Sequence, residues 1–287
     1  MIDIDIIQAN NSSHKEIDSL MIELQEKRID NEIRDTLIFV EHPEIVTVGR
    51  RGMLDGLTAP ENYPSTQVDR GGGLTWHGPG QLVGYPIFQW REESVRKVIT
   101  TIEAWIIESL SEFGVVGVRD QSMQGVWFEG HKVASIGLAF SKWVSRHGFD
   151  INLDTPKGRI EAVEGCGLPL GKHTSLANFG YNISIEEMQN ALLSKMPEIL
   201  GRKVKEVINL ENLGEKQIKI DCDVIQADGG TRTASISGGF VALYLAIDKL
   251  KKTHNIQKPI IKNFVAAISV GVVDKKICVD LDYNEDS

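Results

Sequence analysis

The chain has 287 residues, of which 41% are hydrophobic and 25% charged, which suits a globular protein and excludes a disordered or collagen-like one. Acidic residues outnumber basic residues by 40 to 31, and the resulting formal charge of −9 argues against a broad nucleic-acid-binding face. No apolar run approaches the roughly 18 residues needed to cross a bilayer, and the acidic N-terminus is unlike a signal peptide, so we expect a cytoplasmic protein with no membrane partner.

Strands and helices alternate along the first part of the chain. Residues 3–7 alternate apolar and polar side chains, as a half-buried strand does. Ser13 and Glu16 are spaced as a capping box, and the residues behind them place apolar side chains on one helical face. Further strands are predicted at residues 36–41, 45–48 and 82–88.

Residues 94–113 carry the clearest helical pattern of the chain. One face of this helix is apolar, with Val95, Val98, Ile99, Ile102, Ile106, Leu110 and Phe113. Strands are predicted at 125–128, 132–140 and 143–153, and Ser184 begins a further short helix with a second capping box. This interleaving predicts a mixed α/β (α+β) domain over residues 1–200.

The segment from residue 201 to residue 287 differs from the first domain in charge. It holds 13 basic and 12 acidic residues, a net of +1, so the first 200 residues carry a net of −10. This asymmetry favours two units, at 1–200 and 201–287. In the second, we predict a strand at 217–224, a helix at 231–252, and a hairpin whose strands, at 264–273 and 276–281, flank residues 274–275.

A glycine-rich stretch, RGGGLTWHGPGQ, occupies residues 70–81. Glycine lets a backbone take positive φ and lets a ligand approach the N–H groups closely, and Arg70 and His77 add charge and hydrogen bonding. The spacing matches neither G-x-G-x-x-G nor a Walker loop, so no nucleotide is implied. A binding loop and a purely structural turn region are both compatible with this stretch.

Cys166 lies between two glycines, which favours an accessible sulfur, whereas most lone intracellular cysteines are inert apolar residues. The other two cysteines are Cys222 and Cys278, predicted in strands, and no C-x-x-C occurs, which excludes a cysteine-rich zinc site. A nucleophilic thiolate needs a nearby cation or base. The candidates are Lys132, His147 and His173, although Lys132 at the start of a strand also fits a lysine that reaches solvent.

Four motifs in this order and spacing resemble the lipoyl(octanoyl) transferase family: RGGGLTWHGPGQ, HKVASIGLAF, HGFDIN and GCGLPLGKHTSL. The resemblance covers residues 1–200 and implies a fold similar to biotin protein ligases and lipoate ligases. It also implies transfer of an octanoyl group from octanoyl-acyl carrier protein to a lysine of lipoyl domains. The implied acceptors are the lipoyl domains of 2-oxoacid dehydrogenase complexes and the glycine cleavage H protein, with no cofactor and no metal.

The resemblance also implies roles for individual residues. Cys166 corresponds to the nucleophile that forms an acyl thioester, and Lys132 to the lysine that lowers its pKa. The implied acyl-binding residues are Arg70, Gly71, Gly72, Gly73, Leu74, Thr75, Trp76, His77, Ser135, Ile136, Gly137, Gly148, Phe149 and Asp150. Two positions depart from the family pattern, since Gly165 replaces an expected proline and Asp150 replaces a small or apolar residue.

Residues 201–287 resemble part of ribonuclease PH, a phosphate-dependent exoribonuclease of tRNA 3′ ends. The implied fold is an incomplete α+β segment of the ribosomal protein S5 domain 2-like type. Thr231 and Arg232, at a predicted helix start, would bind phosphate, a role we expect to be vestigial here. The acidic residues that follow could hold a divalent metal or form a solvated tail: Asp280, Asp282, Glu285 and Asp286.

The sequence is compatible with three functions, which its features favour to different degrees. The first is an octanoyltransferase with an appended ribonuclease PH fragment. The second is a bifunctional protein in which the second unit adds tRNA 3′-end processing or RNA binding. Two features argue against it: half of that family's domain is missing, and the charge of −10 on residues 1–200 would repel RNA. The third is a lipoate ligase or a thioesterase on the same fold, and Cys166 argues against the ligase, which needs no thiol.

Overall fold

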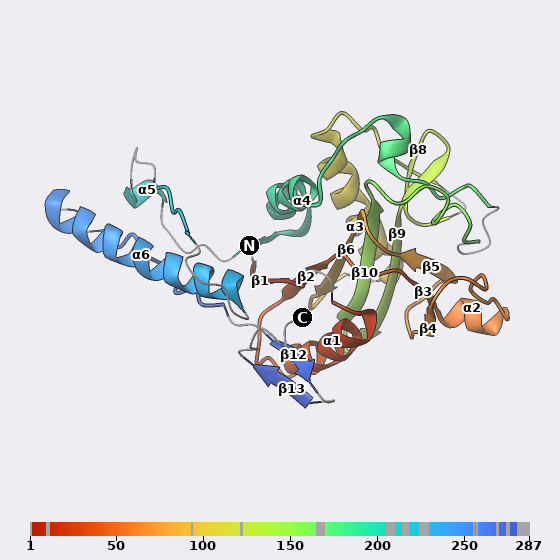
Figure 1. Cartoon of the computed structure of the whole chain (residues 1–287), viewed down its shortest axis with the longest axis horizontal. Coiled ribbons are helices and arrows are strands. Elements are labelled where there is room, and N and C mark those ends of the chain that lie inside the picture. The colour runs from red at the N-terminus through yellow and green to blue at the C-terminus, as the bar shows by residue number, and fades with distance from the viewer. Residues whose placement is uncertain are drawn as a thin grey trace. The chain divides into compact units, whose positions relative to one another are not determined.

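The chain forms two compact units in a computed structural model, Met1–Val204 and Lys205–Ser287 (Figure 1). The structure describes residues 2–9, 12–92, 94–120, 123–164, 170–204, 210–213, 218–223, 230–254, 256, 258–267, 270–273 and 276–279.

The first unit is built on one eight-stranded mixed sheet, which confirms the predicted α/β class. The strands lie in the order β11 (Arg202–Val204), β1 (Ile2–Gln8), β2 (Thr36–Val40), β6 (Gln81–Ile87), β10 (Val144–Asn152), β9 (His131–Ser141), β8 (Val126–Phe128) and β7 (Val118–Arg119). β1 runs parallel to both of its neighbours, and every other adjacent pair is antiparallel. The sheet therefore includes residues beyond Leu200.

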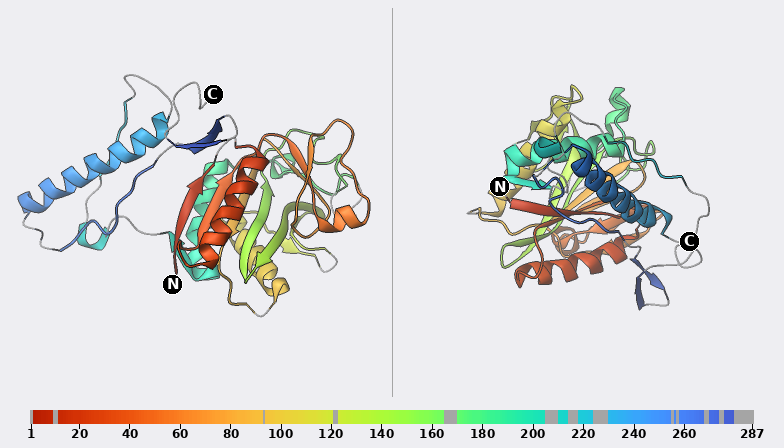
Figure 2. Two further views of the ribbon diagram at one scale, coloured as in Figure 1. Left: turned by 90° about the horizontal axis from the view of Figure 1, so that it is seen from below. Right: turned by 90° about the vertical axis from the view of Figure 1, so that its left-hand side faces the viewer.

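Helices cover both faces of this sheet (Figure 2). Helix α1 (His14–Ile29) packs on one face, and helices α3 (Val95–Ser111) and α4 (Ile185–Leu200) pack on the other. The alternation of side chains along β2 shows how a strand serves both layers. Leu37 and Phe39 join the α3–α4 core, whereas Ile38 and Val40 join the α1 core.

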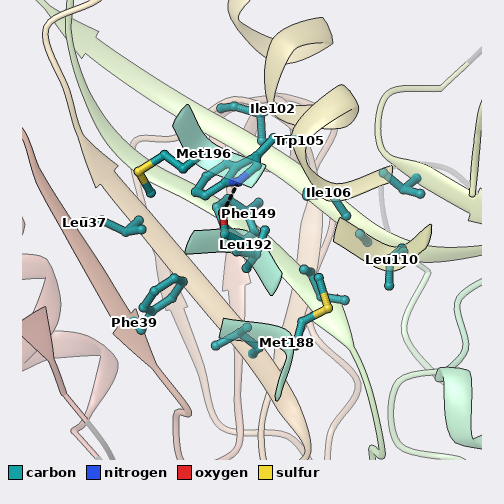
Figure 3. Packing of buried hydrophobic residues seen from close by; sticks show 14 of the residues in the cluster. Leu37, Phe39, Ile102, Trp105, Ile106, Leu110, Phe149, Met188, Leu192 and Met196 are labelled. Atoms are coloured by element: carbon teal, nitrogen blue, oxygen red, sulfur yellow. Dashed lines mark hydrogen bonds between the residues drawn. The ribbon is translucent and has the colours of Figure 1, made fainter. Parts of the chain in front are cut away.

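Trp105 joins α3 to α4 at the centre of the larger core (Figure 3). Its indole Nε1 donates a 2.7 Å hydrogen bond to the backbone oxygen of Leu192 on α4. Its ring meets Phe149 of β10 edge to face, with centroids 5.3 Å apart. Val95 was predicted on this buried face but is 43% exposed, because it occupies the first position of α3, beyond the edge of the contact with the sheet.

The predicted helix starts are confirmed by their caps. Ser13 and Glu16 form a complete capping box at α1, and Ser184 and Glu187 form another at α4. The prediction of a short helix after Ser184 was wrong, since α4 has 16 residues. Its buried residues recur at helical spacing and keep one face on the core throughout: Met188, Ala191, Leu192, Met196 and Leu200.

A second, three-stranded sheet holds part of the glycine-rich stretch. Its order is β4 (Ser65–Gln67), β3 (Ile45–Val48), β5 (Leu74–His77), and helix α2 (Arg50–Leu54) follows β3. The loop prediction was wrong for β5, because Leu74 and Trp76 alternate into an apolar cluster with Val46 and Val48. A short 3-10 helix, Leu176–Phe179, lies before α4.

The second unit contains α5 (Leu210–Leu213), α6 (Thr231–His254) and the strands β12 (Val270–Val273) and β13 (Lys276–Val279). The predicted helix is confirmed, and so is the antiparallel hairpin, although its first strand begins at Val270 and not at residue 264. The predicted strand at 217–224 was wrong, since residues 218–223 have no regular structure. Cys222 in that segment lies against α6, where its Sγ contacts the backbone oxygen of Ser235 at 3.8 Å.

None of the helices in the described ranges is long and apolar enough to cross a membrane.

Candidate active site

Two adjoining cavities lie in the first unit, where the glycine-rich stretch meets β9 and β10. The first spans about 450 Å³ and the second about 290 Å³, and both volumes include space that is open to solvent. Thr75, Ser135 and Asp150 line both. The cavities therefore meet at these three side chains.

Thirteen of the fourteen residues expected to bind the acyl group line one of these cavities. The first is lined by Arg70, Gly71, Gly72, Thr75, His77, Ser135, Ile136, Gly137, Gly148, Phe149 and Asp150, and the second adds Leu74 and Trp76. Gly73 is the exception, and its carbonyl accepts a 2.9 Å hydrogen bond from the backbone N–H of Gly49. The fold thus brings the glycine-rich stretch against two facing segments of the neighbouring strands β9 and β10.

Arg70 holds the glycine-rich stretch in place from inside the protein. It is buried, and its Nη2 donates to the backbone oxygen of Thr47 at 2.9 Å and to the Thr47 hydroxyl at 2.7 Å. Its Nη1 donates to the carbonyl of Gly71 at 2.9 Å, and the N–H of Gly71 donates to the carbonyl of Leu138 at 3.0 Å. The stretch is therefore hydrogen-bonded to both β3 and β9, and these bonds hold the part of it that lines the first cavity.

Lys132 lines the first cavity and is only 3% exposed, so it is not a lysine that reaches solvent from a strand end. Its backbone N–H donates to the carbonyl of Lys172 at 2.8 Å, and its own carbonyl accepts from Thr174 at 3.2 Å. Its side chain passes close to Gly125, where an added Cβ would lie 2.5 Å from Cε. This packing directs a buried amino group toward the site.

Cys166 and Gly165 lie outside the described residues. The chain on either side of them belongs to the site, since Val163 lines the second cavity and His173 forms a bridge with Lys132. Burial and the nearby Lys132 lower the pKa of His173 to about 3, so this imidazole is uncharged at neutral pH. Of the three groups considered as partners of Cys166, Lys132 and His173 lie beside this segment, and the His173 ring is uncharged.

Asp150 places a carboxyl group where the two cavities meet. It is 3% exposed and pairs across the sheet with Ser135, whose backbone N–H donates to Oδ1 at 3.2 Å. Burial raises the pKa of Asp150 to about 7, against the opposing effects of Lys132, Ser135 and Arg70. The site thus contains an acid that changes its charge near neutral pH.

Four histidine rings cluster at one side of the first cavity: His14, His42, His77 and His147. The ring centroid of His14 lies 5.4 Å from His42, 6.1 Å from His77 and 6.4 Å from His147. Burial, aided by His42, His147 and Arg70, lowers the pKa of His14 to about 3, and burial also lowers the pKa of His42. His14, which lines the cavity, therefore presents an uncharged ring to it.

His147 differs from the other three rings. It has a positive φ of 58° within β10, a strained conformation for a residue with a side chain, and its Nε2 lies 2.8 Å from Oδ1 of Asp69. The hydrogen bond from His147 and the charge of Arg146 lower the pKa of Asp69 to about 2 despite partial burial. His147 is thus held at the cavity wall by a charged carboxylate.

Seven cavity residues were not among the expected acyl-binding residues: His14, Val83, Tyr85 and His147 in the first cavity, and Ile160, Val163 and His173 in the second. The alternation of the strand at 82–88 could have indicated Val83 and Tyr85, which share one face. His14 follows the cap residue Ser13, but nothing local to that sequence shows which way the first turn of α1 faces.

Within the described ranges, no group of three or more histidine, cysteine or acidic side chains is arranged to hold a metal ion. In the second unit, Thr231 is the first residue of α6 and follows Gly230, whose φ is +71°. The side chain of Arg232 and the four acidic residues Asp280, Asp282, Glu285 and Asp286 lie outside the part of the chain that the structure describes.

Residues 19–197 match the lipoyl protein ligase A/B catalytic domain family, and residues 177–247 match domain 1 of the 3′ exoribonuclease family. Octanoyltransferases of Syntrophobacter fumaroxidans and Rubrobacter xylanophilus are each 36% identical to the chain, covering 64% and 63% of it and 84% and 86% of the relatives. A bi-partite lipoate protein ligase from Thermoplasma acidophilum has a similar fold, with a TM-score of 0.54 and 15% identity over 72% of this chain and 87% of that one.

Proposed function

The chain belongs to the lipoyl protein ligase A/B catalytic domain family and is an octanoyltransferase of lipoate biosynthesis; we propose that it carries the octanoyl group as a thioester on Cys166. The proposed donor is octanoyl-acyl carrier protein. The proposed acceptors are lysines of lipoyl domains in 2-oxoacid dehydrogenase complexes and the glycine cleavage H protein. We place the reaction in the cytoplasm.

One observation supports the mechanism most strongly. Lys132 and the three expected acyl-binding segments line the same cavity, and both flanks of the segment that contains Cys166 join that site. A buried ammonium beside a thiol favours the thiolate, because the opposite charge stabilises the ionised form. Lys132 is therefore the group that we assign to the activation of Cys166.

The transfer takes two steps. In the first, the Cys166 thiolate attacks the thioester carbonyl of the donor, a new C–S bond forms, and the acyl carrier protein leaves as its thiolate. In the second, the acceptor amine attacks the acyl-enzyme, a C–N bond forms, and the Cys166 sulfur leaves. Thioester exchange is nearly neutral in free energy and amide formation is downhill, so no ATP is required.

Mass spectrometry of the protein mixed with octanoyl-acyl carrier protein tests the covalent step. We expect an octanoyl adduct on Cys166 that moves to an added lipoyl domain, and no adduct on the Cys166→Ala variant. An unmodified protein, or undiminished transfer by Cys166→Ala, would overturn the mechanism.

The role of Lys132 is tested by the pKa of the Cys166 thiol, measured from the pH dependence of its alkylation rate. We expect a higher thiol pKa in Lys132→Ala, because the stabilising charge is removed. An unchanged thiol pKa would show that another group activates the sulfur.

We assign no ribonuclease activity to the second unit. The exoribonuclease match spans residues 177–247, and its residues up to 204 belong to the first unit.

A further inference from the structure

A chain of buried hydrogen bonds runs behind His77. The side-chain Nε2 of Gln81 donates to the carbonyl of Trp76 and to Oδ1 of Asn152, both at 2.9 Å. The Oε1 of Gln81 lies 2.8 Å from Nδ1 of His77. Gln81 and Asn152 are fully buried, and His77 is 5% exposed, so water does not compete for these bonds.

This chain of bonds settles which nitrogen of His77 carries the proton. The carbonyl of Trp76 can only accept, so the amino group of Gln81 must face it. The amide oxygen of Gln81 then faces Nδ1 of His77, which must be the N–H nitrogen. Burial, together with His42, His14 and Arg70, holds the pKa of His77 well below its ordinary value, so the ring is uncharged and Nε2 bears a lone pair.

The lone pair of Nε2 faces the first cavity. His77 lines that cavity together with Lys132. Nε2 has no hydrogen-bond partner in the described part of the chain. It is not one of the fully buried side-chain atoms that lack a partner, so part of its surface is accessible. His42 differs from His77 in that both of its ring nitrogens have partners within the protein: Nδ1 lies 2.9 Å from the carbonyl oxygen of Ser12, and Nε2 lies 2.9 Å from the hydroxyl of Tyr85.

An acceptor at this position suits only one of the two proposed steps. In the first step the attacking and leaving atoms are sulfurs, and neither brings a hydrogen-bond donor to the reacting centre. In the second step the attacking atom is an amine nitrogen, which carries N–H bonds. A neutral nitrogen acceptor can hold one of these N–H bonds and so turn the amine lone pair toward the thioester carbon.

We propose that His77 is a catalytic residue of the second step, in which its Nε2 accepts a hydrogen bond from the attacking lysine amine, and that Gln81 is the residue that positions it. This inference rests on the proposed function. During the step, the C–N bond forms and the C–S bond breaks. The sulfur of Cys166 leaves with the electron pair and takes up the proton that the nitrogen loses, while the N–H held by His77 becomes the amide N–H.

Single-turnover kinetics separate the two steps. Octanoyl-acyl carrier protein is mixed with the enzyme to measure formation of the Cys166 adduct, and a lipoyl domain is then added to measure its loss. In His77→Leu we expect adduct formation within about threefold of wild type and transfer to lysine slowed about tenfold, the upper end of the effect of one lost hydrogen bond. In His77→Gln, whose amide oxygen can replace Nε2, we expect transfer to recover to within about threefold of wild type.

His42→Asn is the matched control, since it alters a buried ring of the same cluster whose nitrogens are both engaged within the protein. It should leave the ratio of the two rates unchanged even if it lowers thermal stability. Equal slowing of both steps in His77→Leu, or transfer as fast as in wild type, would overturn the assignment. Failure of the wild type to form the adduct would instead refute the proposed function.

The protonation of His77 is tested separately by NMR of the ¹⁵N-histidine-labelled protein. We expect a protonated Nδ1 and an unprotonated Nε2 in the wild type, and a mixture of both forms in Gln81→Met, which removes the acceptor of the Nδ1 proton. Gln81→Met should also slow the second step more than the first. A protonated Nε2 in the wild type would overturn the inference.

Discussion

Asp150 is a residue whose protonation near neutral pH is set by the fold. An aspartate in an unfolded chain has a pKa near 3.8, but burial between the two cavities raises the pKa of Asp150 to about 7. The folded protein therefore holds a proton that the unfolded chain releases between these two pH values. Because the folded state binds more protons in this range, Asp150 makes the protein less stable as the pH rises from about 4 to about 7.

Substitution of Asp150 by asparagine tests this linkage. The free energy of unfolding of the wild type should fall relative to Asp150→Asn by up to about 1.4 kcal/mol per pH unit between pH 4 and pH 7, and the difference should level off above pH 7. Urea denaturation at pH 5, 6, 7 and 8 measures it. Asp154→Asn is the control, since it alters an exposed aspartate two residues beyond β10, and it should show no such trend relative to the wild type. If the stability of Asp150→Asn depends on pH in parallel with that of the wild type, the prediction is refuted.

At the scale of the element, the start of β8 determines where Lys132 lies. Gly125, which precedes β8, has a φ of +125°, and its N–H donates to Oε1 of Glu103 on α3 at 2.9 Å. A Cβ at this position would lie 2.4 Å from the carbonyl oxygen of Ala134 and 2.5 Å from Cε of Lys132. The Lys132 side chain thus occupies the space that a side chain at position 125 would need.

Gly125→Ala should therefore displace Lys132 from the site. We expect a raised pKa of the Cys166 thiol and formation of the acyl-enzyme slowed at least about tenfold, since a displaced charge stabilises the thiolate less. The alkylation rate as a function of pH and single-turnover acylation measure the two effects.

Gly130→Ala is the matched control for Gly125→Ala. Gly130 also has a positive φ, +75°, but a Cβ there would have nothing within 4 Å. It should cost stability through backbone strain and leave the thiol pKa unchanged. Equal thiol pKa values in the two folded variants would contradict the assigned role of Gly125.

At the scale of the whole molecule, the last strand of the first unit follows the helix that closes its core. The backbone N–H of Ile2 donates to the carbonyl of Gly201 at 2.8 Å, and β11 pairs with β1. Arg202 is 5% exposed, its Nε donates to Oδ2 of Asp35 at 2.8 Å, and its guanidinium lies over the ring of Phe88 at 4.6 Å. Residues 201–204 are therefore part of the transferase fold.

Truncation distinguishes these four residues from the second unit. We expect a chain that ends at Val204 to stay folded and to keep its transferase activity. A chain that ends at Leu200 should be less stable than the chain that ends at Val204, because it loses the pairing of β11 with β1 and leaves Asp35 with Arg28 as its remaining cationic partner. Arg202→Met in the full chain is the control that keeps β11 and removes the guanidinium with its hydrogen bonds.

Urea denaturation and octanoyl transfer to a lipoyl domain measure these outcomes. Loss of soluble transferase in the chain that ends at Val204 would show that the second unit stabilises the first. Equal stability of the two truncated chains would show that Arg202 contributes nothing to the fold.

Much of the fold could be predicted because its signals are local. Capping boxes at Ser13 and Ser184 locate helix starts through hydrogen bonds that span three residues. The predicted strand at 217–224 failed for the opposite reason, since its apolar residues pack on α6 and not on a neighbouring strand. A strand pattern does not reveal whether a partner strand exists, because that partner is remote in the sequence.

By itself, the sequence determined the class of fold, the family and the segments that line the two cavities, because motif order and periodicity are properties of the chain. Only the tertiary structure decided that Lys132 is buried, that Asp150 holds its proton up to about pH 7, and that Gln81 orients His77. The burial and hydrogen-bond partners of a side chain come from strands and helices far along the chain. These long-range contacts control protonation, and so they decide what the site can do chemically.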